Sequence, residues 1–125
     1  IGIQSPVKTN ELIQVIYANN LAIATSGNYL NYKQKNGKKI GHILDPRTKS
    51  PINHDLISVS IVANQCAVAD GVATGVFVMG LNEAEKWLNQ TQYPALLVVK
   101  INNKIESKFF NGFDRLLDPS TNFSF

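Results

Sequence analysis

Residues 41–74 constrain the fold more than any other stretch, because a polar loop, a strand-like run and a helix-like run follow one another there. Residues 57–63 form a nearly continuous apolar run with two serines, which is typical of a central strand. Residues 66–79 have the pattern of a helix whose first half is rich in small residues, and Gly80 predicts a left-handed end. Small side chains let another backbone, or a ligand, approach this helix closely.

Shorter strands and a second helix are predicted around this stretch. Pro6 stops an opening strand because proline has no amide hydrogen for a sheet ladder, and Asn36-Gly37 predicts a β-hairpin. Asn82 and Glu85 have the spacing of a capping box and predict a helix start. We predict one domain of the α+β class, a mixed or antiparallel sheet with helices packed on one side. The other predicted strands are 1–5, one within 9–20, 21–24, 29–32, 39–40, 93–101 and 104–110, and the second helix is 82–90.

Composition and charge exclude several classes of protein. With 44% hydrophobic and 17% charged residues, 125 residues suffice for one folded domain with a core. No apolar run approaches the roughly 20 residues of a membrane helix, and the first residues lack the features of a signal peptide. The net charge of +3 favours an anionic ligand weakly and lacks the density of a nucleic-acid surface. The start inside a strand leads us to expect further residues upstream, and Cys66 is expected to pack in the core.

Asp70 and Thr74 stand four residues apart in the predicted helix, so both side chains project from one face. Each offers a hard oxygen atom. Mg²⁺ prefers such ligands and keeps water or substrate phosphate at its other positions. The pair therefore predicts one part of a site for magnesium and a pyrophosphate, although an ordinary helix face shows the same spacing.

Two further candidates lie at predicted strand ends. Thr25-Ser26-Gly27 combines two hydroxyls with a flexible residue, and predicts either a turn whose amides cradle phosphate or an ordinary strand-ending turn. His42 precedes a loop stiffened by prolines. It is interpreted either as a general base or anion ligand, or as a histidine bonded to backbone at a strand end.

The loop after His42 carries an acid and a base two residues apart. Asp45 either binds a metal or begins a turn whose amides bind its carboxylate. Arg47 either binds phosphate or lies in solvent. His54 and Asp55, further along, are interpreted as exposed loop.

Four motifs, taken in order, resemble those of one known family. Thr25-Ser-Gly-Asn-Tyr29 resembles Thr-Ser-Gly-Asp-Tyr, and Gly-His-Ile-Leu-Asp-Pro-Arg-Thr at 41–48 resembles a loop His-Ile-Ile-Asp-Pro-Arg-Thr-Gly. Residues 58–63 and 69–74 resemble the strand and the helix that follow this loop in the family. The family is ApbE, the FAD:protein FMN transferases. The resemblance runs from the opening Ile-Gly-Ile to about Lys100 and covers only the C-terminal portion of a family member.

The resemblance implies an ApbE-like, T-fold-related structure and a Mg²⁺-dependent reaction. FAD is cleaved at its pyrophosphate, FMN becomes attached through a phosphoester to a Thr or Ser hydroxyl of a target protein, and AMP leaves. The alternatives are a Mg²⁺-dependent FAD pyrophosphatase, which releases AMP and FMN, and a non-catalytic flavin-binding module. By the same resemblance Asp70 and Thr74 are the metal ligands, and His42 is the catalytic base. The residues expected to bind the flavin cofactor are His42, Thr25, Ser26, Gly27 and Ser58.

The sequence departs from the family's pattern at two positions, and the resemblance does not include the N-terminal half of a family member. Lys49 stands where the family has Gly, and Asn28 stands where it has Asp. The N-terminal half of the family's enzyme makes many flavin contacts and supplies a further metal ligand, so this chain alone is expected to be nearly inactive. The resemblance also implies a bacterial protein of the periplasm, or a lipoprotein attached to the inner membrane.

Overall fold

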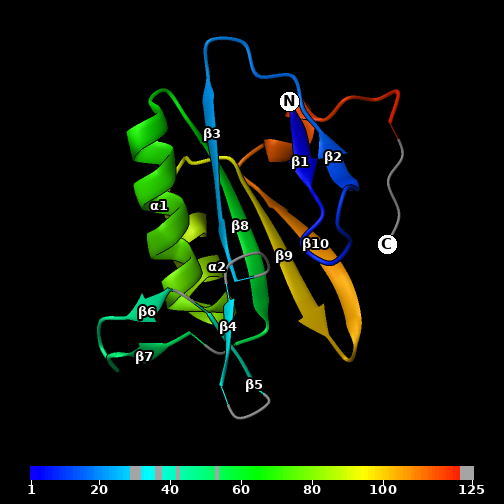
Figure 1. Cartoon of the computed structure of the whole chain (residues 1–125). Coiled ribbons are helices and arrows are strands. Elements are labelled where there is room, and N and C mark those ends of the chain that lie inside the picture. The colour runs from blue at the N-terminus through cyan, green and yellow to red at the C-terminus, as the bar shows by residue number, and fades with distance from the viewer. Residues whose placement is uncertain (29–31, 36–37, 42, 53, 122–125) are drawn as a thin grey trace.

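The computed structural model describes residues 1–28, 32–35, 38–41, 43–52 and 54–121. Its centre is a four-stranded antiparallel sheet with the strand order β10-β9-β8-β3 (Figure 1). β8 and β9 lie inside this sheet and bury most of their side chains, because both faces of the sheet are covered. The four strands are β3 (Ala22–Gly27), β8 (Leu56–Ala63), β9 (Ala95–Ile101) and β10 (Lys104–Phe110).

Two helices cover one face of the sheet (Figure 1). α1 (Cys66–Met79) returns along β8 and β3 and buries its small residues Ala69 and Ala73 against them. α2 (Leu81–Asn89) follows after the single residue Gly80. Within the described ranges, no helix is long and apolar enough to cross a membrane. The predicted α+β class, with helices on one side of the sheet, is confirmed, and the sheet is antiparallel.

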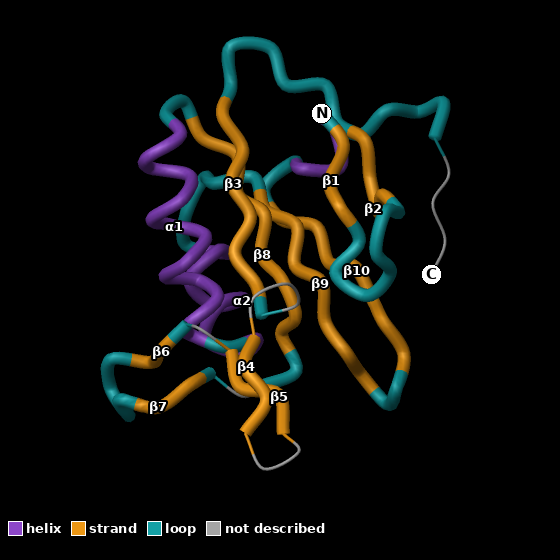
Figure 2. Tube along the Cα trace, in the orientation of Figure 1, coloured by secondary structure: helices purple, strands orange, loops and turns teal. Residues whose placement is uncertain are grey.

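A two-stranded ribbon and a short 3-10 helix cover the opposite face (Figure 2). β1 (Gly2–Gln4) pairs with β2 (Leu12–Val15), and η1 (Phe113–Leu116) contributes the fully buried Phe113. The sequence after residue 110 has no periodic pattern that predicts this turn, because a single short turn has no periodicity. The buried side chains that join this layer to the sheet are Ile3, Ile13, Ile16, Val62, Leu96, Val98 and Phe113.

Two small hairpins lie near the lower end of β3 and α1 in Figure 1. β4 (Tyr32–Lys35) pairs with β5 (Lys38–Gly41), which confirms the hairpin predicted there. β6 (Leu44–Asp45) pairs with β7 (Ser50–Pro51), so the stiff loop after His42 is itself a short hairpin.

Two local expectations in the helices are wrong. Gly80, rather than Asn82, is the N-cap of α2, and no side chain caps that helix. The chain turns at Gly80 with φ 76° and ψ 170°, a backbone geometry open almost only to glycine, so α2 begins one residue before Asn82. Cys66 is exposed, because it is the first residue of α1 and the buried face of that helix begins one turn later, at Ala69.

Candidate functional site

The side of α1 that carries Asp70 and Thr74 also receives the side chain of Ser26 from β3. The hydroxyl oxygens of Ser26 and Thr74 are 2.9 Å apart, and the Thr74 hydroxyl donates to the Asp70 carbonyl at 3.1 Å. Ser26 is 8% exposed, whereas both helical residues are exposed. The packing of α1 on β3 therefore brings the predicted metal pair together with one of the predicted flavin-binding residues.

Thr25, Ser26 and Gly27 do not form the turn expected from the sequence. They continue β3 and pair in register with residues 58–60 of β8. β8 is long enough to offer each of them a partner, and this pairing satisfies backbone groups that a turn would leave open. The proposed cradle of free amides at a strand end is therefore absent from this described segment.

Alternation along the strands sends the predicted flavin-binding side chains to two faces of the sheet. Ser26 points to the helices, whereas the Thr25 hydroxyl lies 2.7 Å from the hydroxyl of Ser60. Ser60 lies between two residues that pack against the helices, so it points to the opposite face. Ser58 is buried and, by the same alternation, shares that face with Ser60. The structure does not bring Thr25 or Ser58 together with Thr74.

Asp45 begins a turn and holds Arg47. One carboxylate oxygen of Asp45 accepts the backbone amide of Arg47 at 2.8 Å, and the other lies 2.7 Å from Arg47 Nη2. The side-chain hydrogen bond from Arg47, followed by the backbone one, lowers the pKa of Asp45 from its ordinary value of 3.8. The guanidinium binds the carboxylate through Nε as well, so Arg47 is already paired and is a weaker candidate for binding phosphate.

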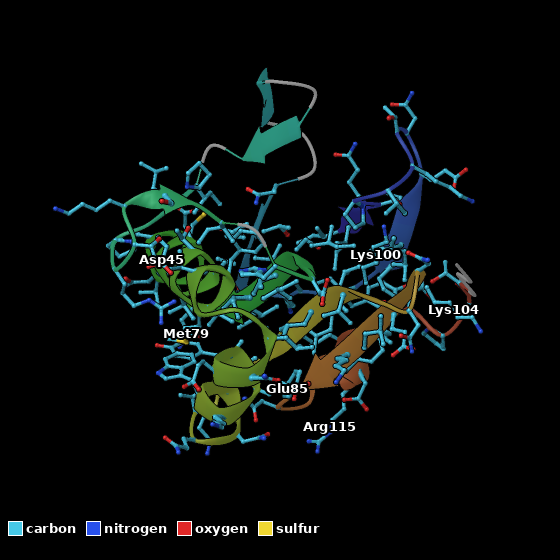
Figure 3. The ribbon with its side chains drawn as sticks, turned by 90° about the horizontal axis from the view of Figure 1, so that it is seen from below. Asp45, Met79, Glu85, Lys100, Lys104 and Arg115 are labelled. Carbon is cyan, nitrogen blue, oxygen red and sulfur yellow. The ribbon has the colours of Figure 1, made fainter. Side chains whose placement is uncertain are left out.

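Two basic side chains bind the last turn of α1. His54 Nε2 is 2.8 Å from the Phe77 carbonyl oxygen, and its ring packs edge-on against the Phe77 ring at 5.1 Å between centroids. Arg47 Nη2 donates to the Val78 carbonyl at 3.4 Å. Figure 3 shows Asp45 and Met79 at this same end of α1. Carbonyls at a helix C-terminus lack partners within the helix, so these contacts fasten the segment before β8 to α1.

His54 is exposed, as predicted, but its bond to α1 was not predicted. No spacing in the sequence indicates that residues 54 and 77 meet, because β8 and most of α1 separate them along the chain. The glycine at position 80 is an indirect sign of this contact. In the structure, a Cβ added at Gly80 would lie 3.3 Å from His54 Cδ2.

Asn28 ties the end of β3 to the segment after β7. Its Nδ2 donates to the Ile52 carbonyl at 3.2 Å, and the Ile52 amide donates to the Ile43 carbonyl at 3.0 Å. An aspartate at position 28 has no such donor and would place a negative oxygen against the carbonyl. The Oδ1 of Asn28 is buried without a partner in the described part of the chain. These hydrogen bonds connect Asn28 to Ile43, the residue that follows His42 in the sequence. His42 itself lies outside the described residues.

The described residues hold only two of the candidate metal ligands that a magnesium site needs. No group of three or more His, Cys, Asp or Glu side chains that could hold a metal ion occurs among them. The Asp70 carboxylate and the Thr74 hydroxyl are both hard oxygen donors, and both are open to solvent. This donor set fits one part of a magnesium site whose other positions belong to water, substrate or further protein atoms.

A cavity of about 580 Å³ lies toward the N-terminal end of α1. Its walls are mostly apolar and include Leu21, Val68 and Tyr93, together with the side chain of Gln65. Among the residues that the structure describes, no predicted site residue lines it. The cluster of Ser26, Asp70 and Thr74 is therefore separate from this cavity.

Comparison with known proteins gives one consistent result. The sequence model of the ApbE family matches residues 1–97. A protein of Vibrio cholerae named FAD:protein FMN transferase is 36% identical over 118 residues, which cover 94% of this chain and 35% of that protein. Its counterpart of the same name from Haemophilus influenzae is 34% identical, with the same coverage of both chains.

A solved structure agrees with these matches. The flavin transferase ApbE from Vibrio cholerae superposes with a TM-score of 0.77 at 34% identity, covering 94% of this chain and 37% of that chain. The chain thus spans about a third of the length of the curated relatives it matches.

Proposed function

The chain belongs to the ApbE family. From that premise we propose that it forms the C-terminal part of a Mg²⁺-dependent flavin transferase. This enzyme moves FMN from FAD to a Thr or Ser hydroxyl of a target protein and releases AMP. The observation that carries the proposal is the cluster of Ser26, Asp70 and Thr74, which places two hard oxygen donors on an exposed side of α1.

Asp70 and Thr74 would hold the magnesium ion. A bound Mg²⁺ offsets the charge that develops on the pyrophosphate oxygens as FMN is transferred and AMP leaves. The carboxylate of Asp70 supplies the negative charge of the pair, and Thr74 supplies a neutral oxygen. Gly71 and Gly75 lie on α1 beside them, and a Cβ at either position would meet nothing within 4 Å. This open, small-sided surface leaves room for a substrate phosphate.

His42 would act as the general base that takes the proton from the acceptor hydroxyl. A neutral hydroxyl is a weak nucleophile, so a base within hydrogen-bond reach accelerates its attack. Membership of the family supports this role, together with the motif Gly-His-Ile-Leu-Asp-Pro-Arg-Thr at 41–48.

The test replaces Asp70 with alanine in the complete protein. We expect Asp70→Ala to abolish Mg²⁺-dependent transfer, measured as flavin attached to an acceptor protein and as AMP released. Asp114→Ala, which removes another exposed carboxylate, is the matched control and should transfer flavin normally. An unchanged rate in Asp70→Ala would remove this residue from the metal site.

The same assay separates the alternatives. AMP and FMN released in the absence of an acceptor would indicate a pyrophosphatase. Tight retention of FAD without release of AMP would indicate a flavin-binding module. Flavin found covalently on the acceptor, with AMP in equal amount, supports the transferase.

A further inference from the structure

Ser26 is buried at the point where β3 meets α1, and its hydroxyl has a single described partner, the hydroxyl of Thr74. Its neighbours on the same face of the sheet are apolar residues of the main core. A buried hydroxyl needs a hydrogen bond, because an unpaired one costs free energy. The contact between Ser26 and Thr74 is therefore a fixed feature of this packing.

The direction of the hydrogen bonds follows from counting protons. Thr74 has one hydroxyl hydrogen, and its oxygen lies 3.1 Å from the Asp70 carbonyl oxygen, which can only accept. If Thr74 donates to that carbonyl, the 2.9 Å contact is a hydrogen bond only when Ser26 is the donor. Both contacts are hydrogen bonds when Ser26 donates to Thr74 and Thr74 donates to the Asp70 carbonyl.

This order determines what Thr74 can offer to a ligand. A hydroxyl oxygen has two lone pairs, and the bond from Ser26 occupies one of them. The other remains available, and Thr74 is exposed on α1. Threonine in a helix divides its side chain between two rotamers, so the two bonds together hold Thr74 in one of them. The lone pair then has a fixed direction.

We propose that Ser26 is a positioning residue that orients the Thr74 hydroxyl as a neutral ligand for a divalent cation. The inference rests on the proposed function, because it takes Asp70 and Thr74 as the metal pair. Ser26 acts through Thr74 and does not itself contact the metal. Residues that orient a metal ligand typically contribute about 10- to 100-fold to metal affinity.

The same strands contain a matched control. Ser60 is 1% exposed and forms a hydroxyl pair of the same kind with Thr25, at 2.7 Å, on the opposite face of the sheet. Ser60→Ala removes one buried hydroxyl and one hydrogen bond, as Ser26→Ala does. Its effect on stability should be similar, whereas Thr74 keeps its partner.

The experiment measures Mn²⁺ binding to the complete protein without FAD, from the electron paramagnetic resonance signal of the free ion. We expect Ser26→Ala to raise the Kd for Mn²⁺ by about 10- to 100-fold. Ser60→Ala should leave that Kd unchanged, with a comparable loss in Tm. Ser26→Thr, which keeps the hydroxyl, should restore binding. If Ser26→Ala does not fold, Ser26→Cys, with its weak S–H donor, replaces it in the same comparison.

The outcomes distinguish the two proposals. Mn²⁺ affinity lost in Asp70→Ala but retained in Ser26→Ala would overturn the positioning role and leave the metal site standing. Equal loss in Ser26→Ala and Ser60→Ala would also overturn it, because a general loss of packing would then be the cause. Normal Mn²⁺ affinity in Asp70→Ala would overturn the metal site and the role of Ser26 with it.

Discussion

Asp45 and Arg47 form a residue pair whose contribution to stability depends on pH. The hydrogen bonds from Arg47 lower the pKa of Asp45 in the folded state, so the folded protein holds this proton less tightly than the unfolded chain does. The pair therefore stabilises the fold above the ordinary pKa of 3.8, and this contribution is lost as the pH falls through the lowered value. We expect Asp45→Asn to lower Tm near neutral pH, and the difference to shrink below pH 3.8. Scanning calorimetry across the acid range measures it.

Asp55→Asn is the matched control for this experiment, because Asp55 is exposed and forms no ion pair within the described segments. Its difference in Tm from the unchanged protein should stay small at every pH. An Asp45→Asn difference that persists unchanged at pH values well below 3.8 would show that its carboxylate charge is not the cause.

His42 is the residue on which the transfer chemistry is expected to depend. We expect His42→Ala in the complete protein to slow flavin transfer by about 10²- to 10⁴-fold, the usual contribution of a general base, with a smaller change in FAD affinity. Single-turnover release of AMP and fluorescence titration of FAD measure the two quantities. His54→Gln is the control, because glutamine keeps a donor for the Phe77 carbonyl. Normal transfer with normal binding in His42→Ala would refute its role as base.

Single residues were predictable where one element determines their position. Asp70 and Thr74 share a side of α1 because a spacing of four residues is slightly more than one helical turn, and the sequence alone predicts that. The meeting of Ser26 with Thr74 depends in addition on the register between β3 and β8 and on how α1 crosses them. That information belongs to tertiary packing, and local spacing does not contain it.

At the scale of elements, glycines on and after α1 have opposite expected effects. Gly80 adopts φ 76° and ψ 170°, so Gly80→Ala should destabilise the protein by about 1–3 kcal/mol. Gly75 is exposed inside the helix, with nothing within 4 Å of an added Cβ. Gly75→Ala should therefore stabilise the protein by about 0.5–1 kcal/mol, because alanine loses less backbone entropy. Urea unfolding measures both changes.

Gly75→Ala also tests why the side chains on this side of α1 are small. If a ligand approaches it closely, the variant should gain stability and lose flavin transfer. A gain in stability with an unchanged rate of flavin transfer would show that no ligand needs the small residue at this position.

Elements were predicted well where hydrophobic pattern alone decides them. The bounds expected for α1 and β10 agree with the structure to the residue. Three details differ from the prediction, and each has its own cause: a partner strand distant in sequence, a short local hairpin, and an unusual backbone geometry. Thr25 to Gly27 stay extended because β8 pairs with them, residues 44–51 fold into a hairpin, and Gly80 moves the start of α2.

At the scale of the whole molecule, the two proposed ligands from one helix are too few to hold a magnesium ion firmly. We therefore expect the 125-residue chain by itself to transfer almost no flavin, even at saturating FAD and Mg²⁺. Covalent flavin on an acceptor protein, detected by its fluorescence in a denaturing gel, measures transfer. Robust transfer by a sample of verified intact mass would show that these residues suffice.

The layers of the molecule were predicted in part. The helix layer follows from the apolar faces of two helical segments, and it was expected. The β1–β2 ribbon was expected as strands, but its place opposite the helices was not, because the buried Phe113 that helps to hold it there lies in a tail without pattern.

β3 carries Ser26 and is also an edge strand of the described sheet. The outward backbone groups of such a strand are a ready template for an extended segment of another molecule. Self-association through β3 would distort the strand that presents Ser26 and would imitate the loss of a site residue. Activity assays on variants therefore need a dilution series: a defect caused by oligomers recovers on dilution, whereas a missing hydroxyl or carboxylate does not.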